Sequence, residues 1–416
     1  MSVENKIAVK ESRFEKGSNI VQGLKDLPKS LNSKTITAGV VAAIFGCTGP
    51  ALLVIKAATD GGLTQVQAIS WLFSIYFFGG LISIFMALKY KMPINGAYSI
   101  PAAAMMIGAL QNFTVYEAAG AYFVSGVLVL ILGFSGLIGK FMKWMPLPIV
   151  MSMIAGALIR FGTGIITSAQ QVPLMGIAAL FGFLVLPKIS KKIPPVLGAL
   201  LLGIITVSLT GGLTWNTAEF KFIAPQLIMP QFSLDAIISI AIPLTILVIG
   251  AENAQATGVL LSQNYKAPVN AMTIISGIGG MLASLFGGHN ANIAGPMTAI
   301  CASEEAGDDK EARYAATVVN GVIFSAFGLV ASLALAFVKG LPKALIGIVA
   351  GLAMINVLYS AFNEGFATKK FKFGSFFALI IAMSGITLFK ISAPFWALLG
   401  GVVVSYLTEP NDFKNR

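Results

Sequence analysis

The fold that we predict for this chain rests on two short stretches, Asn95-Gly-Ala-Tyr-Ser-Ile-Pro101 and Asn290-Ala-Asn-Ile-Ala-Gly-Pro296. In each stretch a proline stands six positions after an asparagine, and small or apolar residues come after the proline. Proline is favoured in the first turn of a helix, because the N–H group that it lacks would have no partner there. We therefore expect each stretch to enter as extended chain and to become helical near its proline.

The composition around these stretches is that of a membrane protein. Of 416 residues, 56% are hydrophobic and 11% are charged, with a mean hydropathy of +0.84. An ordinary soluble domain has about 25% charged residues, so a soluble fold and a disordered chain are both excluded. The two cysteines and one histidine exclude a disulfide framework and a His-rich metal site, and no cofactor is expected.

Apolar segments are predicted to cross the membrane fourteen times. A spanning helix needs about 20 mostly apolar residues. Twelve stretches approach that length, at 35–57, 66–88, 116–139, 147–167, 172–187, 194–212, 233–262, 268–287, 312–338, 341–362, 371–389 and 393–407. Two further segments, 96–110 and 291–303, are short, and they contain the two stretches quoted above.

The distribution of basic residues supports this count. With fourteen crossings and a cytoplasmic N-terminus, most of the 28 Lys and Arg residues fall on the cytoplasmic side. The other side holds Lys56, Lys221, Lys339, Lys343 and Lys390. This is the bias that the positive-inside rule describes. Membrane topology and lipid headgroups therefore explain the net charge of +11, and no nucleic-acid partner is expected. We predict a multi-pass protein of the bacterial inner (plasma) membrane, with both termini cytoplasmic.

The chain divides into two halves of seven segments. We predict a cytoplasmic tail at 1–34, a first repeat at 35–212, a connecting loop at 213–232, a second repeat at 233–408 and a cytoplasmic tail at 409–416. An odd number of segments gives the halves opposite orientations, which is the arrangement of an inverted repeat. The short segments are third and tenth, so their helix N-termini would meet near the midplane and attract anionic or acceptor-rich groups.

Several residues are predicted to bind a solute at this meeting point. The first segment is interrupted by Gly46-Cys-Thr-Gly-Pro50, and the eighth by Gly250-Ala-Glu-Asn-Ala-Gln255. Irregular backbone at that depth is tolerated where it lines a cavity. The predicted substrate-binding residues are Cys47, Thr48, Tyr98, Ser99, Ile100, Glu252, Asn253, Gln255, Asn292, Ile293, Ala294 and Gly295.

Glu252 and His289 are the candidates for proton coupling. An ionised carboxylate inside a membrane costs about 2.5–3.5 kcal/mol on insertion scales, so an intramembrane acid usually has a function. A structural acid tied to backbone N–H groups is the alternative for Glu252, and a hydrogen-bonded structural histidine is the alternative for His289. Arg160 could meet a substrate carboxylate, cap a helix end or reach an interface.

The sequence also resembles a known family. The run Phe286-Gly-Gly-His-Asn-Ala-Asn-Ile293, the run Lys91-Met-Pro-Ile-Asn-Gly-Ala-Tyr-Ser-Ile-Pro101 and the stretch Ser392–Trp396 are similar to motifs of the benzoate:proton symporter family. The resemblance covers residues 35 to 407 and implies the fold of uracil, nucleobase and sulfate-type anion transporters. It implies a core domain from segments one to four and eight to eleven. The remaining segments would form a gate domain, through which such proteins often dimerise.

One departure from that family bears on the substrate. Benzoate symporters tend to carry Ser-Gln-Asn in segment eight, where this chain has Ala251-Glu252-Asn253, and an acid there resembles the nucleobase transporters. We predict no enzyme activity, because no nucleophile–base set or metal cluster is evident. The predicted function is proton-coupled symport of a small planar organic solute, namely benzoate or a related aromatic carboxylate. A proton-coupled uracil- or xanthine-type nucleobase transporter is the alternative, and an anion or small-solute channel is the alternative from another class.

Overall fold

The computed structural model describes residues 15, 17–138, 146–190, 193–213, 221–389 and 391–414. The first part of the predicted N-terminal tail, part of the 213–232 loop and the last two residues lie outside this range. Within it, seven helical spans are long and apolar enough to cross a membrane. They are Ser33–Asp60, Gln65–Tyr90, Val115–Ser135, Leu147–Gln171, Leu234–Ser262, Lys310–Leu329 and Lys343–Phe366.

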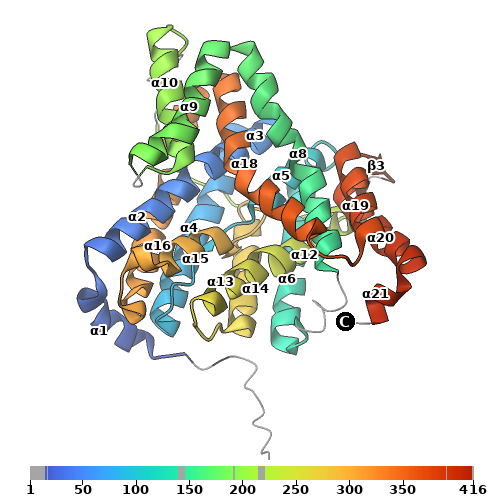
Figure 1. The fold of residues 1–416 in the computed structure, drawn as a ribbon, viewed down its shortest axis with the longest axis horizontal. Helices are drawn as coiled ribbons and strands as arrows, with labels where there is room; N and C mark the ends of the chain where they lie inside the picture. Colours follow the sequence, from blue (N-terminus) through green and yellow to red (C-terminus); the bar gives the residue numbers. More distant parts are fainter. Residues whose placement is uncertain are drawn as a thin grey trace, which may run out of the picture.

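The first half is built mainly from helices (Figure 1). Its helices are α1 (Ile20–Ser30), α2 (Ser33–Cys47), α3 (Gly49–Asp60), α4 (Gln65–Tyr90), α5 (Ile100–Ala109), α6 (Val115–Ser135), α8 (Leu147–Gln171), α9 (Pro173–Ile189) and α10 (Pro195–Leu209). Helices α2 and α3 form one bent span, because the backbone of Thr48 leaves the helical region between them. This is the interruption that the sequence predicted.

The second half contains more irregular helix. Its first span joins α11 (Leu234–Ala236), the π-helical turn η2 (Ile237–Ala241), α12 (Ile242–Leu247), the π-helical turn η3 (Val248–Asn253) and α13 (Ala254–Ser262). There follow α14 (Val269–Ser284), α15 (Gly295–Ala302), the 3₁₀ turns η4 (Glu304–Ala306) and η5 (Lys310–Ala312), α16 (Tyr314–Leu329), α17 (Ala331–Lys339), α18 (Lys343–Phe366), α19 (Lys372–Ser384), α20 (Ala393–Thr408) and α21 (Pro410–Lys414). Glu252 lies in η3, and such π turns are frequent at functional sites.

The two quoted stretches pair with each other. Strand β1 (Gly96–Ala97) is antiparallel to β2 (Asn292–Ile293), with Gly96 opposite Ile293 and Ala97 opposite Asn292. Helix α5 then begins with Pro101 in its first turn, and α15 begins with Pro296 in its first turn. The predicted change from extended chain to helix near each proline is confirmed. A second antiparallel pair joins β3 (Thr387–Leu388) to β4 (Ile391–Ser392).

Close glycine contacts hold the central helices together. Helix α4 packs on α16 and α6 packs on α14. A Cβ atom at Gly80 would lie 2.5 Å from the backbone oxygen of Gly321, and one at Gly277 would lie 2.8 Å from that of Gly126. Small residues at such crossings let the helix backbones touch, which is how membrane helices gain packing energy.

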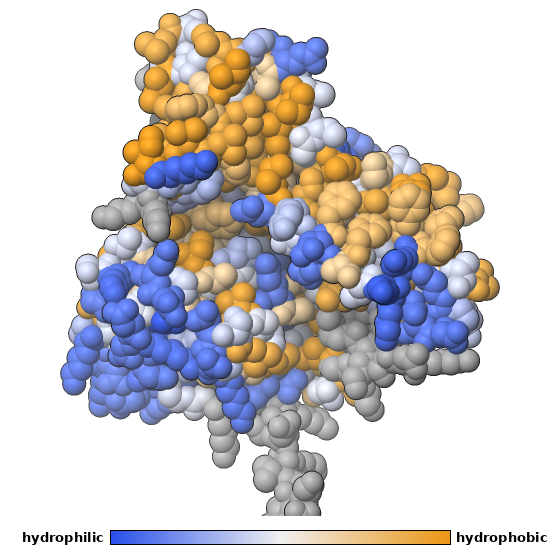
Figure 2. Space-filling view, in the orientation of Figure 1, coloured by the Kyte–Doolittle hydropathy of each residue, from blue (hydrophilic) through white to orange (hydrophobic). Residues whose placement is uncertain are grey.

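Helix α1 is amphipathic and docks on the ends of α4 and α16. The Tyr314 hydroxyl donates to the Gly23 carbonyl, and an ion pair joins Lys91 to Asp26 at 3.1 Å. Hydrogen bonds from Gln22 and Lys91 hold the pKa of the Asp26 carboxyl below its ordinary value. Figure 2 shows hydrophilic side chains gathered over this lower part of the molecule and apolar ones over α9 and α10. The outer face of α1 therefore suits a membrane surface.

The packing predicts opposite results for alanine at two helical glycines. A methyl group at Gly277 would meet the backbone of α6, whereas the space beside Gly164 in α8 is open. We expect Gly277→Ala to destabilise the protein by about 1–3 kcal/mol through overpacking. Gly164→Ala should leave the melting temperature unchanged or raise it, because alanine favours helix. Thermal unfolding of the detergent-purified variants measures both, and equal melting temperatures would contradict the contact.

Candidate functional site

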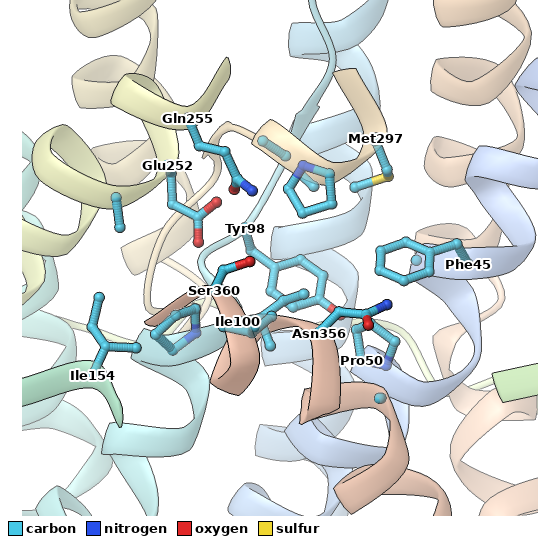
Figure 3. A pocket seen from close by; sticks show the side chains of 18 of the residues that line it. Phe45, Pro50, Tyr98, Ile100, Ile154, Glu252, Gln255, Met297, Asn356 and Ser360 are labelled. Atoms are coloured by element: carbon cyan, nitrogen blue, oxygen red, sulfur yellow. The ribbon is translucent and has the colours of Figure 1, made fainter. Parts of the chain in front are cut away.

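A cavity of about 630 Å³ lies beside the starts of α5 and α15, a size typical of small-molecule sites. Tyr98 and Ile100 line it from the first short segment, and Ala294 and Pro296 line it from the second. Figure 3 shows Glu252 and Gln255 at one side of this space. It also shows the side chains of Asn356 and Ser360, from α18, among those that line it. The apolar lining includes Phe45, Met151, Ile154, Phe183, Met297 and Leu352.

The two helix N-termini converge on one carboxyl group. Glu252 is 5% exposed, and its carboxyl faces the Ser99 hydroxyl and the backbone N–H groups of Ile100 and Gly295. Ile100 and Gly295 are the first residues of α5 and α15. Free N–H groups and the positive ends of helix dipoles stabilise a negative charge, so this point suits a carboxylate or another anionic group.

Two asparagines fix the crossing of the short segments. The Oδ1 atom of Asn290 accepts from the Ser99 N–H at 3.0 Å, and the carbonyl of Asn95 accepts from the Ala294 N–H at 2.9 Å. The Asn95 amide donates to the Met297 carbonyl at 3.2 Å and accepts from the Asn320 amide at 2.8 Å. These asparagines marked the repeated spacing in the sequence, and the structure adds that they bind each half to the other.

His289 is fully buried and lies outside the cavity lining. The Trp71 Nε1–H donates to its Nδ1 atom at 2.9 Å, and its Nε2 atom lies 2.9 Å from the Ser99 carbonyl. Since Nδ1 accepts, Nε2 must carry the proton and donate it. The imidazole thus holds the residue just before α5. The predicted part of His289 in proton coupling stays a prediction.

The cavity brings together five of the twelve predicted binding residues: Tyr98, Ile100, Glu252, Gln255 and Ala294. Ser99 and Gly295 do not line it but face the Glu252 carboxyl. Cys47, Thr48, Asn253, Asn292 and Ile293 lie outside the lining.

Two residues outside the lining have structural partners instead. Asn253 donates to Thr273 Oγ1 at 3.3 Å and accepts from Ser276 Oγ at 3.1 Å, which ties η3 to α14. Arg160 donates to the carbonyl of Ala104 in α5 at 3.2 Å and also lies outside the lining. Because Ala104 lies in the middle of α5, this contact is not the helix-end cap that the sequence offered as one alternative.

Sequence reasoning missed the contribution of α18. Asn356, Ser360 and Glu364 line the cavity at a spacing of four residues, which places them on one face of a helix. That periodicity is readable in the sequence, but the predicted segment ended at residue 362. Only the packing of α18 against the other helices shows which of its faces meets the cavity.

The comparisons with known proteins agree with this architecture. A family model described as "Benzoate membrane transport protein" matches residues 29–407. The inner membrane protein YdcO of Escherichia coli is 29% identical over 392 residues, covering 92% of this chain and 99% of that protein. The benzoate membrane transport protein of Acinetobacter baylyi is 24% identical over 387 residues, covering 92% and 97%.

A solved structure shares the fold. The transmembrane domain of the cyanobacterial bicarbonate transporter BicA has a TM-score of 0.62 and 15% identity, covering 89% of this chain and 97% of that chain. This likeness shows a shared fold. It does not support the uracil and nucleobase part of the expected resemblance.

The asparagine contacts predict a large effect of one substitution. Asn95→Ala would leave the buried Met297 carbonyl and the Asn320 amide without these partners, and each such loss costs about 1–3 kcal/mol. We expect a clearly lower melting temperature and reduced transport. Asn112→Ala is the matched control, because Asn112 is exposed and bonds only locally to the Gly108 carbonyl. Equal stability of the two variants would refute the structural role of Asn95.

Proposed function

Because this chain belongs to the benzoate membrane transport protein family, we propose that it is a secondary transporter that carries benzoate or a related aromatic carboxylate together with a proton. The observation that carries the proposal is the convergence of the Ile100 and Gly295 N–H groups on the Glu252 carboxyl. The same donors suit the carboxylate of a substrate. The family model and one relative are described as benzoate membrane transport proteins, and another relative is an inner membrane protein, so the chain is a membrane transporter rather than an enzyme.

Electrostatics gives the reason for coupling. Two ionised carboxylates about 4 Å apart repel by about 4 kcal/mol at an effective dielectric constant of 20. A substrate carboxylate at the helix starts would share the cavity with Glu252, so the two cannot both be ionised without that cost. A proton on Glu252 removes the repulsion and turns its carboxyl into a hydrogen-bond donor. The proton and the aromatic anion therefore enter together.

The rest of the cavity suits an aromatic ring. Phe45 and Tyr98 supply ring surfaces, and Met297 supplies a polarizable thioether. Aromatic pairs and sulfur–aromatic contacts each add about 0.3–1.5 kcal/mol beyond simple burial. Tyr98 is held in place because its hydroxyl lies 2.7 Å from the Tyr76 hydroxyl, which in turn donates to the Gly46 carbonyl. An apolar wall opposite a cluster of N–H donors matches an aromatic carboxylate at both ends.

We further propose fourteen crossings in two inverted repeats. Seven long spans and a set of shorter apolar helices supply segments for this count. The contacts also correspond between the halves. The second segment meets the eleventh at Gly80 and Gly321, and the ninth meets the fourth at Gly277 and Gly126. Exchanging the halves converts one pair of helices into the other, as an inverted repeat requires.

The helix ends near the cavity indicate the side of the membrane to which it would open. Its lining includes Leu147, Gly258, Ile300 and Glu364, which lie near helix ends that lead to lysine-containing loops. By the positive-inside rule those loops are cytoplasmic, so the cavity would open inward. Transport would then require movement of the half-helix core against α8 and α18. A homodimer formed through the gate helices stays a prediction.

The coupling predicts a separation of two activities in one variant. In proteoliposomes with an inward proton gradient, we expect the wild type to accumulate labelled benzoate. Glu252→Gln mimics the protonated acid, so it should still exchange benzoate across the membrane but lose gradient-driven accumulation. Glu305→Gln is the control, because Glu305 is exposed in the loop after α15.

Other outcomes of this experiment decide between the alternatives. Gradient-driven benzoate accumulation by Glu252→Gln would place the coupled proton elsewhere, with Glu364→Gln the next variant to examine. Uptake of uracil or xanthine, but not of benzoate, would support the nucleobase alternative. Uptake that never raises the internal concentration above the external one, and that a protonophore does not change, would indicate a channel.

The same electrostatics predicts the pH dependence of binding. Benzoate remains an anion across the neutral range, so its affinity depends on whether Glu252 is protonated. We expect the benzoate dissociation constant of the wild type to rise as the pH increases and Glu252 ionises. The value for Glu252→Gln should stay nearly constant. Titration of purified protein with benzoate at several pH values measures this, and parallel pH profiles would disprove the assignment.

A further inference from the structure

Helix α18 presents hydrogen-bonding groups to the cavity that the transport of plain benzoate does not use. Asn356 and Ser360 line the cavity one helical turn apart. In the part of the chain that the structure describes, neither side chain makes a hydrogen bond or an ion pair. Both are thus free to bind a molecule in the cavity.

The opposite face of α18 is fixed, so the position of this pair is defined. Met354 and Ala361 are fully buried. A Cβ atom at Gly351 would lie 2.5 Å from the Phe161 carbonyl oxygen of α8, and one at Gly365 would lie 2.5 Å from Ser152 Oγ. Helix α18 therefore cannot rotate without breaking its close contact with α8.

The cavity has different chemistry on its two sides. The N–H groups at the starts of α5 and α15 can donate hydrogen bonds to a negative group, whereas α18 offers an amide and a hydroxyl. Glu364 lies one turn beyond Ser360 on the same face, and its carboxylate would repel a second anionic group. A solute that satisfies both sides carries one carboxylate and, elsewhere on its ring, a neutral hydrogen-bonding group.

We propose that Asn356 and Ser360 are specificity-determining residues and that the preferred substrates are aromatic monocarboxylates with a hydroxyl or amino group on the ring. This inference rests on the proposed function and names its substrate class. When the core closes against α18, water leaves the cavity and the Asn356 amide needs a new partner. A ring hydroxyl supplies that partner, but a C–H group or a methyl group leaves the amide unpaired, which a polar site penalises strongly.

The test compares ring substituents of similar size. Unlabelled benzoate, 3- and 4-hydroxybenzoate, 3- and 4-methylbenzoate and phthalate compete with labelled benzoate for uptake into proteoliposomes that contain the full chain. For the wild type we expect at least one hydroxybenzoate to compete about fivefold or more better than its methyl counterpart, as hydrogen-bonding sites discriminate. Phthalate should compete poorly because of Glu364.

Substitutions on α18 assign that preference to its residues. Asn356→Leu and Ser360→Ala should each reduce the hydroxyl-to-methyl ratio, and the double variant should bring it close to one. Asn363→Leu is the matched control, because Asn363 lies on the same helix outside the cavity lining, and its ratio should equal that of the wild type. Thermal unfolding identifies any variant that fails to fold, and the other single variant then decides.

Three results would overturn the inference, and they differ from failure of the proposed function. A wild type that prefers the methyl compounds has no polar subsite. A hydroxyl preference that survives in both α18 variants comes from other residues. If no aromatic carboxylate competes, or labelled benzoate does not enter, the proposed function has failed and the inference fails with it.

Discussion

The antiparallel pairing of β1 with β2 is the interaction on which the rest of this structure depends. Inside a membrane each backbone N–H and C=O group needs a partner within the protein, so extended chain at that depth is stable only when it is paired. Gly96 opposite Ile293 and Ala97 opposite Asn292 provide that pairing between segments almost 200 residues apart. Because both extended stretches are satisfied in this way, α5 and α15 can begin in the interior with their N-termini free to hold a charge.

The charge at this meeting point belongs to the protein. The Glu252 carboxyl lies where a substrate carboxylate would be most stable, facing the N–H groups of Ile100 and Gly295. In the proposed mechanism one set of donors serves two possible anions, and repulsion between those anions links the proton to the substrate. Placing the acid in the π-helical turn η3 directs it toward both half-helices, since an extra residue per turn changes the direction of the side chains that follow.

Closely packed helices surround the paired strands on one side of the cavity, and α18 lies on the other side. Glycine contacts between α4 and α16, and between α6 and α14, bring backbones together around the paired strands. His289 and Trp71 add a buried chain of hydrogen bonds that ends on the Ser99 carbonyl. Across the cavity, α18 is packed just as closely on α8 and exposes polar side chains toward the core. The site is therefore formed between two closely packed groups of helices.

From the sequence alone we could predict the membrane class, the long apolar helices and the two proline-marked half-helices, and we could name Glu252 as a candidate acid. Those features follow from local chemistry: apolar length, the missing N–H group of proline and the cost of a carboxylate in lipid. Tertiary structure alone decided that Asn95 and Asn290 bind the halves to each other. It also decided that Asn253 faces α14, and that Asn356 and Ser360 face the cavity. A polar residue in an apolar helix can point to a neighbouring helix, a cavity or a backbone carbonyl, and only the packing of distant segments selects one of these directions.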